Sequence, residues 1–102
     1  MDESSFERRA RVIKAMAHPS RLQMIDALSE GERCVCELQR LVGADMSTVS
    51  KHLSLMKRAG LVADRKQGLQ VFYRLKVPCI LRFFDCVDAV LRNGSARART
   101  GT

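Results

Sequence analysis

Two cysteines separated by one residue, Cys34-Val35-Cys36, are the part of this sequence best suited to chemistry. A thiolate can bind soft metal ions and can be oxidised reversibly. Arg33 and the start of a predicted helix would both favour thiolate over thiol. The pair therefore predicts a site for a thiophilic ion or for oxidation.

The other two cysteines, Cys79 and Cys86, fall on an apolar stripe of the predicted last helix. Cysteine in such a stripe behaves as a small hydrophobic residue. We expect both to pack in a core, with metal ligation as the alternative. His18 and His52 are isolated, and the sequence has no nucleophile–base pair, phosphate-binding glycine loop or paired carboxylates. The chain is therefore not expected to be an enzyme.

The positive charge of the chain is concentrated in one segment. The net charge is +7 over 102 residues, and residues 47–76 carry seven Lys and Arg side chains against the single acid Asp64. This distribution is typical of a surface that faces a polyanion, although a solvated basic face would look the same. The sequence has no apolar run near ~18 residues and no leader pattern, which predicts a cytoplasmic chain without a membrane span.

Four helices are expected in the first sixty residues. The capping pattern Ser4-x-x-Glu7 starts a helix over residues 5–17, and Pro19 opens a second that Gly31 stops. A third helix is predicted over residues 34–42 and a fourth over residues 46–59. A tight glycine-containing turn joins these last two, which makes a helix-turn-helix.

After residue 60, the spacing of apolar residues changes from that of helices to that of strands. Residues 61–66 and 69–75 flank Gln67-Gly68, which predicts a β-hairpin with basic residues at its tip. Pro78 opens a last helix to about Arg92, ended by Asn93-Gly94-Ser95. We expect one domain over residues 1–92 and a disordered tail over residues 93–102.

The predicted fold is mainly α with a small β-hairpin, a winged helix-turn-helix in the order α-α-α-α-β-β-α. The last helix is apolar over a wide arc and needs more than one neighbour. A homodimer formed through the first and last helices is the simplest arrangement that covers it.

The fourth helix is expected to enter the major groove of operator DNA. Its hydroxyl and basic side chains lie away from the apolar side formed by Val49, Leu53 and Met56, where they can contact bases and phosphates. His52 lies at the border of the two faces, and a packed or phosphate-contacting ring is favoured over metal ligation. The expected DNA-binding residues are Ser47, Thr48, Ser50, Lys51, His52, Arg65, Lys66 and Gln67.

Several segments together resemble the ArsR/SmtB family of metal-responsive repressors. They run from Glu-Arg-Cys-Val-Cys-Glu-Leu through Ser-Thr-Val-Ser-Lys-His-Leu to the hairpin, over residues 32–75, and residues 15–22 are similar to the family's first helix junction. The resemblance covers residues 8–92. It implies a homodimeric winged-helix repressor that leaves its operator when a metal or metalloid ion binds. It also places residues 47–52 on the recognition helix.

The Cys-Val-Cys-Glu-Leu run resembles the thiolate site of the arsenic, antimony, cadmium and lead sensors. The sequence departs from their pattern at Gln39, where the arsenic sensors carry a third cysteine, and residues 1–33 contain no cysteine. The resemblance therefore implies Cys34 and Cys36 as ligands, with Cys79 or Cys86 as a possible third. As(III) or Sb(III) is the first choice of inducer and Cd(II) or Pb(II) the next, with no permanent cofactor.

Geometry adds a condition to this hypothesis. Residues i and i+2 of an α-helix point about 200° apart, so both thiols can hold one ion only if the third helix unwinds at its start. Two alternatives stay open. One is a repressor whose dithiol is oxidised, and the other is a winged-helix protein-interaction module with structural cysteines.

Overall fold

The computed structural model describes the backbone of residues 3–100 and the side chains of residues 3–94. Helix α1 (Ser5–Met16) and helix α2 (Pro19–Leu28) lead to helix α3 (Val35–Val42) and helix α4 (Met46–Arg58). The predicted capping box of Ser4 and Glu7 is present at α1. Gly43 ends α3 with a φ of 76°, so the tight turn of the helix-turn-helix rests on a left-handed glycine.

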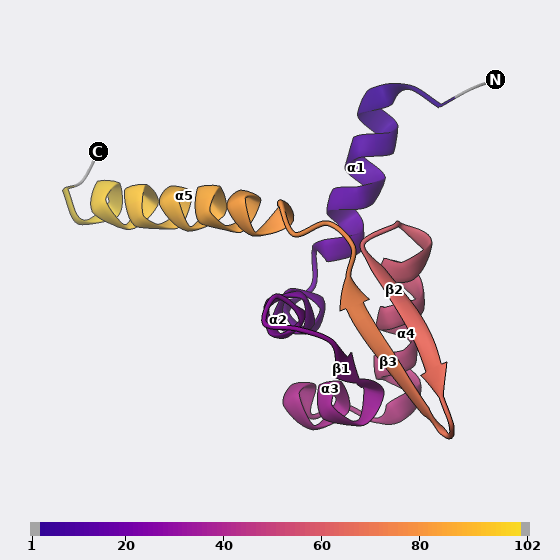
Figure 1. Cartoon of the computed structure of the whole chain (residues 1–102). Coiled ribbons are helices and arrows are strands. Elements are labelled where there is room, and N and C mark those ends of the chain that lie inside the picture. The colour runs from indigo at the N-terminus through magenta and orange to yellow at the C-terminus, as the bar shows by residue number, and fades with distance from the viewer. Residues whose placement is uncertain (1–2, 101–102) are drawn as a thin grey trace.

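A three-stranded antiparallel sheet completes the winged helix-turn-helix (Figure 1). Strand β2 (Val62–Gln67) and strand β3 (Gln70–Leu75) form the wing, and strand β1 (Arg33–Cys34) pairs with the other edge of β3. The sequence did not predict β1, because two residues show no alternation and the pairing partner is distant along the chain. The predicted turn was off by one residue, since Gln67 pairs with Gln70 and the turn is Gly68-Leu69.

The core lies where the four helices meet the sheet. Its fully buried side chains come from α2, α3, α4 and the start of the wing, and they include Met24, Ile25, Leu38, Val49, Leu53, Met56, Leu61 and Val62. Helix α4 thus buries the apolar side that its sequence predicted. Helix α4 packs against α2, α3 and β2.

Helix α5 (Ile80–Thr100) extends away from the wing (Figure 1). The predicted helix end near Arg92 and the tail from residue 93 are therefore wrong over residues 93–100, and residues 101–102 lie outside the described chain. The segment after Gly94 is rich in Ala and Arg, which have high helix propensity. Within the described residues, no helix is long and apolar enough to cross a membrane.

Candidate DNA-binding surface and cysteine pair

Helix α4 begins at a strong N-cap. The Asp45 carboxylate accepts a hydrogen bond from the Thr48 amide at 2.7 Å and another from the Ser47 hydroxyl at 2.9 Å. The bond from the Thr48 backbone is the main reason that the pKa of Asp45 is lowered. This cap fixes the first turn, the part of a recognition helix that enters a groove.

The predicted DNA face of α4 is exposed over most of its length. Ser47, Thr48, Ser50 and Lys51 are all solvent-accessible, opposite the buried side of the helix. His52 is different, because it is half-buried and its Nδ1 lies 3.0 Å from a guanidinium nitrogen of Arg21 on α2. Burial is the main cause of its lowered pKa. Structure thus brings four of the five predicted α4 residues onto an open surface.

The wing presents less free charge than its sequence suggested. Arg65 forms two hydrogen bonds to the Glu32 carboxylate, at 2.8 and 2.6 Å, and a third to Gln67 Oε1 at 2.6 Å. Its guanidinium also lies 4.7 Å from the Phe72 ring centroid. The hydrogen bond from Arg65 lowers the pKa of Glu32. Lys66 is exposed and, among the side chains described, has no ion pair.

A second ion pair ties the recognition helix to the wing. Lys57 Nζ lies 2.9 Å from Asp64 Oδ1, and this hydrogen bond raises the pKa of Lys57. The contact joins the last turn of α4 to β2, the two elements that the sequence predicts to face DNA.

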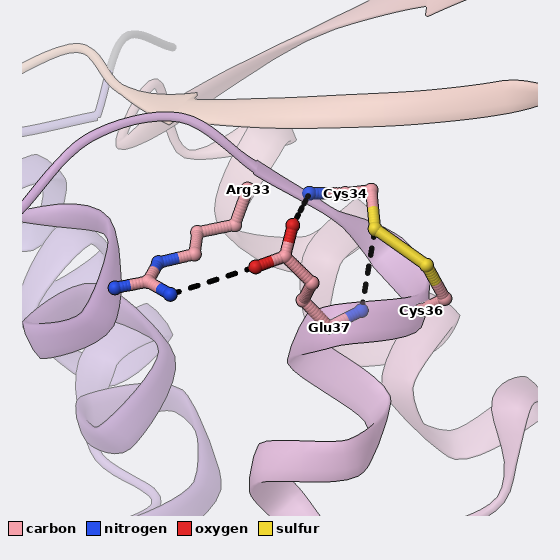
Figure 2. The surroundings of a disulfide bond; sticks show 4 residues. All are labelled: Arg33, Cys34, Cys36 and Glu37. Carbon is pink, nitrogen blue, oxygen red and sulfur yellow. Dashed lines mark hydrogen bonds and ion pairs between the residues drawn. A yellow bond between two sulfur atoms is a disulfide. The ribbon is translucent and has the colours of Figure 1, made fainter.

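Cys34 and Cys36 are joined by a disulfide at the start of α3 (Figure 2). Cys34 is the N-cap residue of the helix: its Sγ accepts the Glu37 amide at 3.4 Å, and the Glu37 carboxylate accepts the Cys34 amide at 3.4 Å. Glu37 also lies 3.5 Å from Arg33. The Arg33 charge expected beside the thiols is therefore shared with carboxylates.

The prediction that α3 must unwind to bring the thiols together is wrong. Cys34 lies before the helix, with extended backbone at φ −77° and ψ 157°, and only Cys36 is in the first turn. The side chains therefore do not diverge by the helical angle, and the two Cα atoms are 5.4 Å apart. Closure of the pair needs no helix distortion.

The cysteine pair is close to α4 and to the wing. It lines a hollow of about 420 Å³ whose other walls include Met46 and Ser50 of α4 and Gln70 of β3. Cys34 is 6% exposed and pairs with Phe72 in the sheet, whereas Cys36 is exposed. Cys36 is therefore accessible from solvent, and the hollow beside it is bordered by α4 and β3.

Among the residues that the structure describes, no third ligand accompanies the pair. Within the described part of the chain, no group of three His, Cys, Asp or Glu side chains could hold a metal ion. Cys79 and Cys86 are exposed thiols near the start of and within α5, so the expectation that they pack in this chain's core is wrong. Their stripe is uncovered because α5 projects away from the rest of the chain (Figure 1).

Two partners of the predicted site were not found from the sequence. Glu32 binds Arg65 across 33 positions, and Arg21 binds His52 across 31. Both are contacts between separate elements, and neither residue belongs to a local motif that would have indicated it. The charge segregation of residues 47–76 pointed to the surface but not to its internal pairing.

Comparison with known proteins agrees with this architecture. Residues 18–64 match the model of the bacterial regulatory protein, arsR family. The chain is 42% identical over 72 residues to the arsenical resistance operon repressor of Escherichia coli, covering 70% of this chain and 62% of that one. It spans 36% of the length of a longer HTH-type transcriptional regulator from Mycobacterium tuberculosis.

Solved structures support the same assignment. The homodimeric winged helix-turn-helix DNA-binding domain of a possible ArsR-family regulator from Mycobacterium bovis has a TM-score of 0.74 and 33% identity, with 90% of each chain covered. Reduced HlyU from Vibrio cholerae has a TM-score of 0.72 and 32% identity, covering 80% of this chain and 90% of that one. The chain belongs to the arsR family of DNA-binding transcriptional regulators.

Proposed function

We propose that this repressor leaves its operator when Cys34 and Cys36 pass from dithiol to disulfide. The observation that carries the proposal is the position of the pair, which needs no third group and no helix distortion to close. In the reaction, the two thiols lose two protons and two electrons to hydrogen peroxide, which is reduced to two molecules of water. A solved structure of the related HlyU from Vibrio cholerae is of its reduced form, which supports a redox-sensitive state in a relative.

The coupling to DNA runs through Cys34. This residue pairs with β3 of the wing and caps α3, which packs on α4. Fixing its side chain to Cys36 restrains the first turn of α3 and the edge of the sheet together. The reduced state is the one that binds DNA, and oxidation shifts the population toward a state with lower operator affinity.

The DNA contacts are assigned to the open face of α4 and the wing. Ser47, Thr48, Ser50 and Lys51 contact bases and phosphates, while Arg65, Lys66 and Gln67 lie along the backbone. A dimer that neutralises roughly 6–10 phosphates should lose about 10³–10⁵ in affinity between about 50 and 200 mM salt. The homodimer is expected to form through α1 and α5, whose exposed apolar side chains support this interface. The related M. bovis domain is homodimeric.

A second inducer hypothesis is favoured by one relative. The arsenical resistance operon repressor of E. coli is 42% identical, which supports As(III) or Sb(III), and next Cd(II) or Pb(II), as a ligand of the reduced pair. A soft trivalent ion with three thiolates would need Cys79 or Cys86, brought to the pair by a second subunit. The oxidation hypothesis needs neither.

One titration separates the two hypotheses. A reduced operator complex is treated in parallel with peroxide, arsenite and Cd(II), and binding is followed by fluorescence anisotropy. We expect peroxide to weaken binding by at least about tenfold, or about 1.4 kcal/mol, and a dithiol reductant to restore it. Cys34→Ser and Cys36→Ser should bind DNA and fail to respond; serine can still cap α3.

The control is the double variant Cys79→Ser/Cys86→Ser. It should respond to peroxide like the wild type, because both residues lie outside the pair. If arsenite releases the wild type but not this double variant, and peroxide releases neither, the oxidation hypothesis fails and the metalloid hypothesis replaces it.

A further inference from the structure

A cluster of two histidines and one arginine joins the recognition helix to the rest of the domain. Arg21 of α2 contacts His52 of α4 at 3.0 Å, and the rings of His52 and His18 lie with centroids 4.4 Å apart at 48°. His18 is the N-cap residue of α2, where its Nδ1 accepts the Ser20 amide at 3.0 Å. Neither the DNA face nor the cysteine pair explains this arrangement.

The hydrogen bonds assign an acceptor role to Nδ1 of each ring. An arginine guanidinium has only donors, so His52 Nδ1 must be the acceptor in its contact with Arg21. The Ser20 amide is also a donor, so His18 Nδ1 accepts from it. The contact with Arg21 therefore requires a neutral His52 ring with its proton on Nε2. Protonation of His52 Nδ1 would turn this acceptor into a donor and break the bond.

The surroundings of His52 disfavour its cationic form. Burial is the largest cause of the lowered pKa of His52, and its neighbours His18, in the connection between α1 and α2, and Arg21 on α2 lower it further. Arg21 has a buried Nε without a hydrogen-bond partner among the described side chains, so loss of the His52 contact would leave its guanidinium still less satisfied.

Charges on the other elements around α4 are engaged or located elsewhere. On β2, Asp64 is paired with Lys57. On α1, Arg11 and Lys14 line a hollow with Arg58, at the far end of α4. On α3, Glu37 is paired with Arg33, and Arg40 faces α2 in a hollow with Gln23 and Asp26. No carboxylate among these compensates a proton on His52.

We propose that His52 is a positioning residue whose neutral ring, held by Arg21, anchors α4 in the orientation that binds the operator. Protonation of His52 places a cation against Arg21 and His18, which loosens the contact between α4 and α2. Operator affinity then falls as the pH decreases below neutrality. The inference rests on operator binding alone and holds whichever signal acts at Cys34 and Cys36.

The sign of the pH effect distinguishes this role from direct DNA contact. A histidine that touched phosphate would bind a proton more tightly in the complex, so operator affinity would rise on acidification. The contact between neutral His52 and Arg21 predicts the opposite, a fall in operator affinity on acidification. The chain has two histidines, so the pH window near neutrality reports on few groups.

The test measures operator affinity of the reduced full chain at constant salt, from about pH 7.5 to about pH 5.5. We expect the wild type to lose roughly threefold to tenfold in operator affinity over this range. One linked proton changes an affinity by at most about tenfold per pH unit, so the protonation of His52 alone can produce this loss. His52→Asn keeps an acceptor where Nδ1 lies but cannot be protonated, so its operator affinity should lose most of the pH response, whatever its affinity at the higher pH.

His18→Asn is the matched control, since asparagine still caps α2. It should keep a pH response, because His52 and Arg21 remain. An affinity that rises on acidification, or a response that His52→Asn retains in full, would overturn the proposal. Failure of the wild type to bind the operator at the higher pH would instead contradict the proposed DNA binding by α4 and the wing. That result is distinguishable from a failure of the His52 proposal.

Discussion

Arg65 illustrates how a distant residue changes what a basic side chain offers to DNA. The sequence placed it on the wing as a phosphate contact, but Glu32 holds its guanidinium in a two-bond ion pair. Exposed pairs of this kind contribute little to stability. Their main effect is electrostatic competition, because a phosphate must displace the carboxylate before it can bind Arg65.

Replacing Glu32 by Gln should therefore tighten operator binding. The substitution removes the competing charge and keeps a hydrogen-bond acceptor for Arg65. If Arg65 gains a phosphate, the slope of log affinity against log salt should steepen by about 0.9 per subunit. Salt-dependent anisotropy measures this. Glu30→Gln is the control, since Glu30 pairs with Arg33 instead. Equal effects from both variants would mean a general charge effect, with no release of Arg65.

At the scale of elements, local signals predicted most of the fold. Pro19 opens α2 as expected, and Gly43 ends α3 where its neighbours require a left-handed residue. The features that the sequence did not predict have a common cause: each depends on contacts with another element that is distant along the chain. Strand β1 exists because β3 offers it an edge, and Cys34 leaves the helix to join that strand. The exposed face of α4 was predictable, whereas the contacts of His52 and Arg65 depend on elements some thirty residues away.

Gly43, which ends α3, and Gly94, which lies within α5, give a testable contrast. Gly43→Ala should lower the free energy of unfolding by about 1–2 kcal/mol, because its φ of 76° disfavours a side chain. Gly94→Ala, within α5 and with nothing within 4 Å of an added Cβ, should not lower it. Urea denaturation measures both. Equal destabilisation by both substitutions would show that the left-handed turn is not what Gly43 provides.

At the scale of the whole molecule, the uncovered faces of α1 and α5 need a partner. Phe6 is 76% exposed, Val90 67% and Leu91 63%, and a hollow of about 720 Å³ between α1, α2 and α5 is lined mainly by apolar side chains. We expect a second copy of the chain to cover these faces and to supply a second α4 for the other half-site of the operator.

A charge placed on this face should separate the subunits without unfolding them. Val90 and Leu91 are exposed in the single chain, so Val90→Asp/Leu91→Asp should cost a monomer little, whereas the dimer would have to bury two carboxylates per subunit. Sedimentation velocity should therefore give a monomer with native circular dichroism. Operator affinity should fall by at least about a hundredfold, since two linked half-sites bind far more tightly than one.

Arg92→Asp is the control for this pair, because Arg92 is exposed but lies outside the apolar stripes. It should remain a dimer, although the added negative charge will weaken DNA binding slightly. A double variant that stays dimeric would place the interface elsewhere. The link between dimer formation and operator binding is thus tested on a face that contains neither α4 nor Cys34 and Cys36. A loss of affinity beyond that of Arg92→Asp therefore follows from the missing second α4.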